Sequence, residues 1–298
     1  MTRELRSLIT GSSSGFGRAT AVTLARAGHR VFAAMRAITS KNAGPASELA
    51  ELAAREGLAL RVIELDVTSD ASVDAAVARV LDEAGGVDVV INNAGVLSQG
   101  PLEAFTVAQA EATFQVNYLG AVRVNRAVLP AMRRQKSGLL VHVSSAVGRV
   151  VTPLFGHYSA SKFALEAMAE CYSYELAPLG IDVAIVEPGA FPTTGVMANA
   201  MQADEARAAE YGPLFALATE LWKPVIETMK RQGPPDPQQV ADAILRLTAL
   251  PAGERPLRTV LDPLGNGAVE EINRKTADVQ RAYIAWMGLG GVLGRAGG

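Results

Sequence analysis

The sequence has few of the residues that would define several other kinds of protein. It contains one cysteine, Cys171, which excludes an internal disulfide framework and a cysteine-based metal cluster. The three histidines, His29, His142 and His157, lack the spacing of a zinc motif, so we expect no metal site. The 28 basic and 30 acidic residues leave a net charge of −2, so no charge field attracts nucleic acid or an anionic membrane.

Long hydrophobic runs are absent as well. No stretch of about 18 apolar residues could cross a bilayer, and the N-terminal segment lacks the apolar core of a signal peptide. Hydrophobic residues nevertheless make up 49% of the chain and charged residues only 19%, a balance that excludes a disordered chain and supplies a sizeable core. We therefore expect a soluble, cytoplasmic, globular protein with no nucleic-acid or membrane partner.

Short β-branched segments alternate with longer alanine-rich segments, which is the rhythm of repeated βαβ units. Several short segments are apolar at consecutive positions, which indicates a parallel sheet covered by helices on both faces. We predict an α/β fold, a single doubly wound Rossmann-type domain over residues 1–298 with about seven parallel strands. The predicted strands are residues 7–10, 30–34, 60–65, 87–91, 139–144, 181–186 and 257–261, and the clearest helices are residues 17–27, 69–83, 114–135 and 159–177.

The alternation of strand-like and helix-like segments is interrupted in the last third of the chain. Residues 193–232 are helix-prone with no predicted strand, and we expect the segment 193–236 to cover the substrate, with a dimer contact as its alternative role. Apolar residues at helical spacing predict a final amphipathic helix over residues 266–288, before a loose glycine-rich tail at 289–298. The apolar wall expected from the covering segment consists of Met197, Met201, Leu214, Phe215 and Trp222.

A glycine-rich turn of the pattern TGxxxGxG follows the first predicted strand. Its Gly11, Gly15 and Gly17 let the backbone approach a phosphate at the N-terminus of a helix, although a plain strand-to-helix turn remains the alternative. Polar residues then follow four later strands, at the edge where ligands bind in a parallel sheet, and a nucleotide lying across that edge explains them together. They are Asp66, the run from Asn92 to Gly95, Ser145, and the pair Pro188 and Gly189.

A phenol and an ammonium lie four residues apart, at Tyr158 and Lys162, on one face of a predicted helix. A phenol with a pKa of about 10 is a poor base at neutral pH, and we expect the nearby ammonium to lower that pKa. Ser145, at the end of a predicted strand, can donate to a substrate carbonyl or a developing alkoxide. Together the three side chains indicate acid–base chemistry at a carbonyl or an alcohol.

With these motifs the chain resembles the short-chain dehydrogenases/reductases over about residues 5–262. The resemblance implies that Ser145 polarises the carbonyl, that Tyr158 exchanges the proton, and that Lys162 holds the nicotinamide ribose. It also implies a proton relay through a water at Asn117, and a homodimer or homotetramer. The expected cofactor-binding residues are Gly11, Ser13, Ser14, Gly15, Phe16, Gly17, Arg36, Asp66, Val67, Asn93, Ala94, Gly95, Tyr158, Lys162, Pro188, Gly189 and Thr193.

The expected cofactor is NADP rather than NAD. No acid stands at the end of the second strand, where folds that prefer NAD bind the ribose 2′-hydroxyl, and Arg36 can pair with a 2′-phosphate. Arg18 and Lys41 add positive charge nearby, and a solvated loop arginine is the alternative for Arg36.

The expected reaction interconverts a ketone and a secondary alcohol on a largely apolar or aromatic small molecule, oriented by Ser145 and Tyr158. Two alternatives stay open. The first is a non-catalytic dinucleotide-binding sensor or scaffold, and the second is a lyase or dehalogenase on the same fold.

Overall fold

Consecutive apolar residues along the strands determine how the layers stack. In β1 (Arg6–Thr10), both Leu8 and Ile9 lack exposed surface, although neighbouring residues of a strand point to opposite faces of the sheet. Leu8 belongs to a core cluster on one face and Ile9 to a second cluster on the other. Helices must therefore cover both faces. The computed structural model describes residues 4–196 and 199–290 of the chain.

The main sheet is parallel, and its seven strands within the described residues have the order β3-β2-β1-β4-β6-β7-β9. The carboxyl ends of the strands therefore share one edge of the sheet. This arrangement confirms the predicted α/β fold of Rossmann type. The other strands are β2 (Arg30–Met35), β3 (Leu60–Glu64), β4 (Val89–Asn92), β6 (Gly138–Val143), β7 (Ile181–Pro188) and β9 (Arg258–Leu261).

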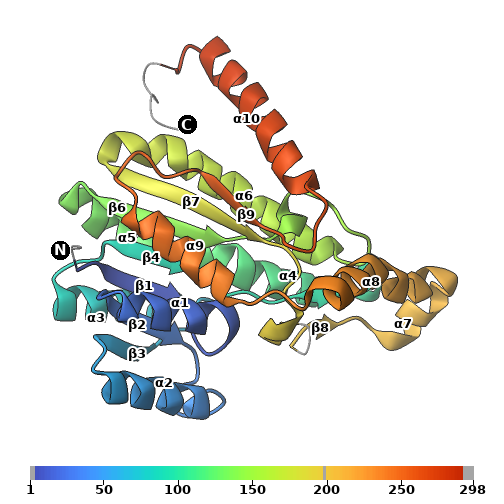
Figure 1. Cartoon of the computed structure of the whole chain (residues 1–298), viewed down its shortest axis with the longest axis horizontal. Helices are drawn as coiled ribbons and strands as arrows, with labels where there is room; N and C mark the ends of the chain where they lie inside the picture. The colour runs from blue at the N-terminus through green and yellow to red at the C-terminus, as the bar shows by residue number, and fades with distance from the viewer. Residues whose placement is uncertain (1–3, 197–198, 291–298) are drawn as a thin grey trace.

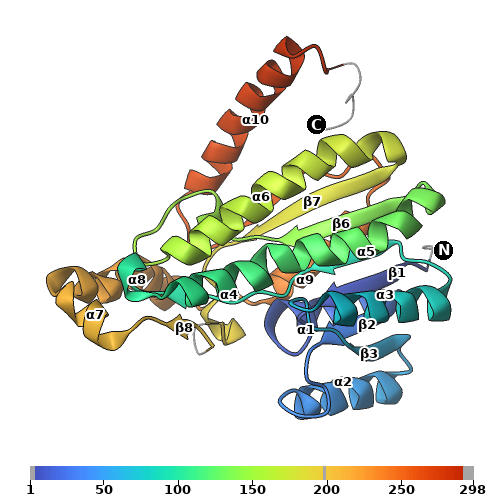
Figure 2. The same ribbon diagram turned by 180° about the vertical axis from the view of Figure 1, so that it is seen from behind.

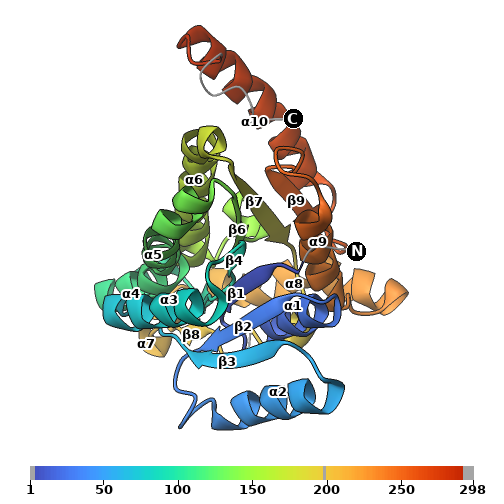
Figure 3. The same cartoon turned by 90° about the vertical axis from the view of Figure 1, so that its left-hand side faces the viewer.

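The helices lie in two layers, which Figure 3 shows on either side of the twisted sheet. The first core cluster packs α3, α5 and α6 against one face, and the second packs α1, α2 and α9 against the other. The bounds are α1 (Gly15–Arg26), α2 (Ala43–Glu56), α3 (Asp70–Ala84), α4 (Val107–Asn117), α5 (Leu119–Gln135), α6 (Gly156–Leu176) and α9 (Gln238–Ala249), with short 3-10 helices η1 (Leu102–Ala104), η2 (Ala146–Gly148), η3 (Ala177–Leu179) and η4 (Pro192–Thr194).

Two predictions about helical segments are wrong. The helix predicted over residues 114–135 is two helices, α4 and α5, that meet at Tyr118. The break follows Asn117, whose side chain bonds to both the backbone N–H and the carbonyl of Val96 and so holds the end of α4 there. The segment 193–232 contains a strand, since β8 (Met201–Gln202) pairs with β5 (Ser98–Gln99). Two residues are too few to show a strand period in the sequence.

Two parts of the last third of the chain project from the body of the fold (Figures 1 and 2). α7 (Glu205–Glu210) and α8 (Pro213–Gln232) lie at one end, near β8, and α10 (Ala268–Trp286) stands away from the body. Although α10 was predicted as amphipathic, its apolar Val279 and Trp286 are exposed. No helix within the described ranges is long and apolar enough to span a bilayer. Most of the predicted tail, residues 291–298, lies outside the described residues.

Candidate active site

The strand order reverses between β1 and β4, and the glycine-rich turn follows β1 at this point. Ligands of open α/β sheets bind in the crevice that such a reversal creates. Thr10 Oγ1 accepts the backbone N–H groups of Asn93 and Ala94, each at 3.0 Å. Asn93 Nδ2 in turn donates to the carbonyls of Thr10 and Gly11, at 2.9 and 3.1 Å. The turn after β1 is thereby tied to the end of β4 across the crevice.

The glycines of the turn form a cradle that side chains would fill. Gly11 has a φ of +70°, and a Cβ atom there would lie 2.8 Å from the Cα of Ala94. A Cβ atom at Gly17 would lie only 2.3 Å from the carbonyl oxygen of Gly11. The bare backbone thus lies at the start of α1, where unpaired N–H groups and the positive end of the helix dipole favour a phosphate. The residues present fit a dinucleotide.

A cavity of about 450 Å³ connects this cradle to Tyr158 and Lys162. Gly17 is not among the described residues that line it, and Thr194 lines it where we predicted Thr193, which is exposed. The other predicted cofactor-binding residues all line the cavity, namely Gly11, Ser13, Ser14, Gly15, Phe16, Arg36, Asp66, Val67, Asn93, Ala94, Gly95, Tyr158, Lys162, Pro188 and Gly189.

The predicted catalytic side chains meet at one end of this cavity. Ser145 starts η2, directly after β6, and its Oγ donates to the carbonyl of Pro188 at 3.4 Å. Ser145 and Tyr158 both line this part of the cavity. Lys162 follows Tyr158 by one turn of α6, with Nζ 5.8 Å from the centroid of the phenol ring. Nζ donates to the carbonyl of Val143 at 2.8 Å.

Burial controls the protonation of both titratable groups. It raises the pKa of Tyr158 above the ordinary value, and the nearby Ser145 hydroxyl offsets this only in part. Burial also lowers the pKa of Lys162 to about 8, although the carboxylate of Glu166 acts in the opposite direction. The expected lowering of the Tyr158 pKa by Lys162 is therefore not found, because the phenol loses its solvent and the ammonium is bonded to Val143.

Asn117 lies close to Lys162, but its side-chain oxygen and nitrogen both already have hydrogen-bond partners. A Cβ atom at Gly95 would lie 3.4 Å from Asn117 Oδ1 and 3.7 Å from Lys162 Nζ, so the two side chains flank Gly95. Besides Val96, Asn117 Nδ2 binds Ser161 Oγ at 2.9 Å. Asn117 is 2% exposed and is not among the described residues that line the cavity.

At the other end of the cavity, two cations face the solvent. Arg36 and Lys41 are exposed and line the cavity. Arg18, predicted to add charge here, lies 3.4 Å from the carboxylate of Glu48 and is not among the described lining residues.

Sequence analysis missed the group that shapes the loop carrying Arg36. The two carboxylate oxygens of Glu64, at the end of β3, accept the backbone N–H groups of Ala37 at 2.6 Å and Ile38 at 2.9 Å. No sequence signal marks this contact, because the partners are backbone groups on a different strand-to-helix connection.

The predicted covering segment contributes residues that sequence analysis did not single out. Val196 and Asn199 line the cavity. Ahead of this segment, the Phe191 ring packs edge to face on Phe16 at 5.2 Å between centroids. Trp222 of α8 packs on Phe155, next to the start of α6, at 6.0 Å. In the predicted apolar wall, Met201 is half-buried and Leu214 is exposed, whereas Met197 and the side chain of Phe215 lie outside the described residues.

Comparison with known proteins identifies the family. The profile of the short chain dehydrogenases matches residues 6–205. A 3-ketodihydrosphingosine reductase of Bacteroides thetaiotaomicron is 34% identical over 257 residues, which are 86% of this chain and 87% of that protein. A short-chain dehydrogenase structure from Streptomyces avermitilis is 34% identical, with a TM-score of 0.73 and 96% of each chain covered.

Related structures also contain dinucleotides. An alcohol dehydrogenase from Thermococcus sibiricus, complexed with 5-hydroxy-NADP, is 26% identical with a TM-score of 0.67, covering 87% of this chain and 96% of the other. Another structure of the fold is in complex with NAD. The chain therefore belongs to the short chain dehydrogenase family, and it is an NAD(P)-dependent oxidoreductase that acts on CH–OH groups.

The glycine cradle gives a first testable prediction. Gly17→Ala should lower the free energy of unfolding by about 1–3 kcal/mol, because the new methyl group meets a backbone carbonyl that cannot move away. It should also weaken dinucleotide binding. Urea denaturation and a fluorescence titration with NADPH measure the two effects. As a matched control, Gly44→Ala in α2 meets nothing within 4 Å and should stabilise the protein by up to about 1 kcal/mol. If both variants showed the same change in the free energy of unfolding and in NADPH affinity, the proposed role of the glycine cradle would be wrong.

Proposed function

We propose that the protein is an NADP-dependent oxidoreductase that interconverts a ketone and a secondary alcohol on a largely apolar or aromatic small molecule. The observation that carries the proposal is the meeting of Ser145, Tyr158 and Lys162 at the end of a cavity that starts at the glycine cradle. A sensor or scaffold would need the cradle but not a serine and a tyrosine that line the same cavity beside a buried lysine. Turnover therefore separates the enzyme from the non-catalytic alternative.

The chemistry divides between the cofactor and the chain. A bound nicotinamide supplies or accepts the hydride. The hydroxyl of Ser145 donates to the substrate oxygen and stabilises the charge that develops there. Tyr158 keeps its proton at neutral pH, because a phenol has an ordinary pKa of about 10 and burial raises it further, and a protonated phenol is the form that can protonate an alkoxide. Lys162, bonded to Val143, adds a positive charge beside the phenol.

The charge around the loop after β2 favours NADP. Arg36 and Lys41 line the cavity from exposed positions, where a 2′-phosphate can reach them. The acid that reaches this loop, Glu64, uses both oxygens on backbone N–H groups. It is thus not free to bind a ribose 2′-hydroxyl in the way that NAD-preferring folds do.

Two observations support an apolar substrate. Val196 and Phe191 lie in the cavity wall on the side of Pro188, and Trp222 covers Phe155 next to the catalytic helix. The Bacteroides thetaiotaomicron relative is named for 3-ketodihydrosphingosine, a ketone with a long alkyl chain. We infer that this chain, too, binds its ketone largely through apolar area, with Ser145 and Tyr158 fixing the orientation.

The cofactor preference can be measured directly. The wild-type protein should use NADPH with a kcat/KM at least about tenfold above that with NADH, because a charge-assisted contact contributes about 1.5–3 kcal/mol. Arg36→Gln should lose this preference through KM for NADPH, while the values with NADH change little. Arg26→Gln, which removes an exposed ion pair between the last residues of α1 and α2, is the control. Equal or better use of NADH by the wild type would refute the assignment.

The substrate class is tested with a series of ketones of increasing chain length. Each buried methylene contributes about 0.8 kcal/mol, so KM should fall about fourfold per carbon until the pocket is full. A polar keto sugar of similar size is the comparison compound. A KM that does not fall with chain length, or a preference for the sugar, would contradict an apolar pocket.

The role of Tyr158 is tested by Tyr158→Phe. The ring keeps its packing but loses the exchangeable proton, so kcat should fall by about 10²–10⁴-fold while the dissociation constant for NADPH changes by less than about twofold. Tyr172→Phe, on the same helix and packed against the core, should retain full activity. If Tyr158→Phe keeps more than about a tenth of the wild-type rate, another group donates the proton.

A further inference from the structure

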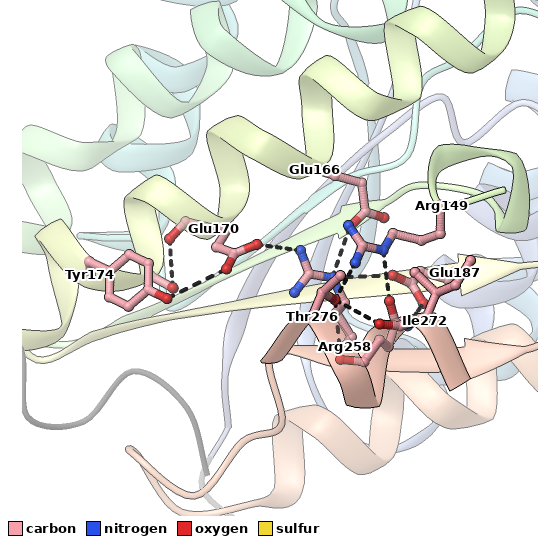
Figure 4. A network of polar contacts seen from close by, with 10 residues as sticks. Arg149, Glu166, Glu170, Tyr174, Glu187, Arg258, Ile272 and Thr276 are labelled. Carbon is pink, nitrogen blue, oxygen red and sulfur yellow. Dashed lines mark hydrogen bonds and ion pairs between the residues drawn. The ribbon is translucent and has the colours of Figure 1, made fainter. Parts of the chain in front are cut away.

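A partly buried network of polar side chains connects α6, β7, β9 and α10 (Figure 4). Its centre is Arg258 on β9. The guanidinium donates from Nε to Glu166 Oε2 at 3.0 Å and from Nη2 to Glu170 Oε2 at 2.6 Å, both on α6. Its Nε also lies 3.4 Å from Oε1 of Glu187, on β7. One arginine thus connects the last strand of the sheet, its neighbour and the helix that carries Tyr158.

The projecting helix α10 joins the network through Asn273. Its Nδ2 donates to Glu187 Oε2 at 2.5 Å, and its Oδ1 accepts from Arg149 Nε at 2.7 Å. Arg149 further donates from Nη2 to Thr276 Oγ1 at 2.6 Å. A single amide on α10 therefore connects the residue that follows η2 with the buried end of β7.

The stability of the fold does not account for this cluster. Three carboxyl groups surround Arg258, and Glu187 has no exposed surface. Burial and the nearby Glu166 raise the pKa of Glu187 to about 8, which favours its protonated form at neutral pH. Apolar side chains of the same volume would often stabilise a protein as well as such a cluster does, or better. The charged cluster is therefore expected to have a role other than stabilising the fold.

Each segment that carries a catalytic group also carries a member of the network. Arg149 directly follows η2, the turn that Ser145 starts. Glu166 follows Lys162 by one turn of α6, and Glu187 precedes Pro188. The carbonyl of Pro188 accepts the hydrogen bond from Ser145 Oγ. The network therefore determines how three elements lie relative to one another: the turn η2 that Ser145 starts, the helix α6 that carries Tyr158, and the end of β7.

We propose that Asn273 is a positioning residue for the reaction, because its amide holds the turn after Ser145 against the end of β7. The inference rests on the proposed oxidoreductase function. Asn273 and Arg258 both lie beyond residue 205, where the match to the family profile ends. This chain thus aligns its catalytic segments with residues from outside the matched region.

The two contacts of Asn273 need a side chain that donates and accepts at once. Leucine at this position would do neither. Aspartate would accept from Arg149 but would repel Glu187 once that carboxyl ionises. In the double variant Asn273→Asp/Glu187→Gln, the amide at position 187 can donate to the aspartate. The contact is then restored with its direction reversed, so the double variant serves as a rescue.

The experiment uses the full-length protein with NADPH and the best ketone of the series. Small misplacements of reacting groups cost up to about 10²-fold in rate, so Asn273→Leu should lower kcat by about 10- to 100-fold. The dissociation constant for NADPH should change by less than about twofold, because the glycine cradle lies at the other end of the cavity. In the protein without ligand, amide exchange of residues 145–149 and of Glu187 and Gly189 should become about tenfold faster.

The pH dependence gives a second readout that a purely structural role would not move. The groups that face Glu187 are Glu166 from α6, Arg258 from β9 and Asn273 from α10. In Asn273→Asp, Glu187 can donate to the new carboxylate only while it holds its proton. The kcat of this variant relative to the wild type should therefore fall as the pH rises, and Glu187→Gln in the same background should remove that fall.

The control variant is Arg281→Gln on the same helix, where the arginine is exposed and pairs only with Asp278 among the described residues. It should leave kcat and amide exchange unchanged. If Asn273→Leu only lowers the melting temperature and keeps kcat within about twofold, Asn273 is structural and the inference is overturned while the proposed function stands. If the wild type reduces no ketone, the proposed function fails, and unchanged amide exchange in Asn273→Leu would overturn the positioning role independently.

Discussion

Burying both faces of a parallel sheet leaves its carboxyl edge as the place where polar side chains can gather without cost. Leu8 and Ile9 illustrate the constraint, since successive residues of β1 belong to two different cores. All seven strands of the main sheet point the same way, so the polar residues that follow them meet at one edge, and the reversal between β1 and β4 opens a crevice there. The glycine cradle, Ser145 and Pro188 are near one another for this reason, although they are far apart in the sequence.

The parts of the site that could be predicted are those in which chemistry requires particular residue types at a fixed spacing. The glycine turn and the pair Tyr158 and Lys162 are of this kind, because a helix places residues four apart on one face. Contacts between distant segments leave no such pattern. Glu64 binds the backbone of another connection, and Asn273 meets Glu187 across 86 residues. The helix break after Asn117 was missed because a side-chain contact with Val96 causes it rather than a proline or a glycine.

The cost of burying charge shapes both the active site and the network around Arg258. Burial raises the pKa of Tyr158, lowers that of Lys162 to about 8 and raises that of Glu187 to about 8. In each case the interior favours the neutral form. The sequence does not reveal these directions, because the sign of each shift depends on how much solvent the fold removes. The raised pKa of the Tyr158 phenol and the raised pKa of the Glu187 carboxyl group are both consequences of desolvation.

The positions of Arg258 and Asn273 in the chain have a consequence for biosynthesis. A ribosome that adds about 5–20 residues per second makes the 86 residues between Glu187 and Asn273 in roughly 4–17 s. During that interval the nascent chain already contains the glycine cradle, Ser145, Tyr158 and Lys162, but not the arginine and the amide that align them. Catalytic competence would thus be acquired only after α10 has been made and Asn273 can join the network, rather than when the last catalytic residue is made.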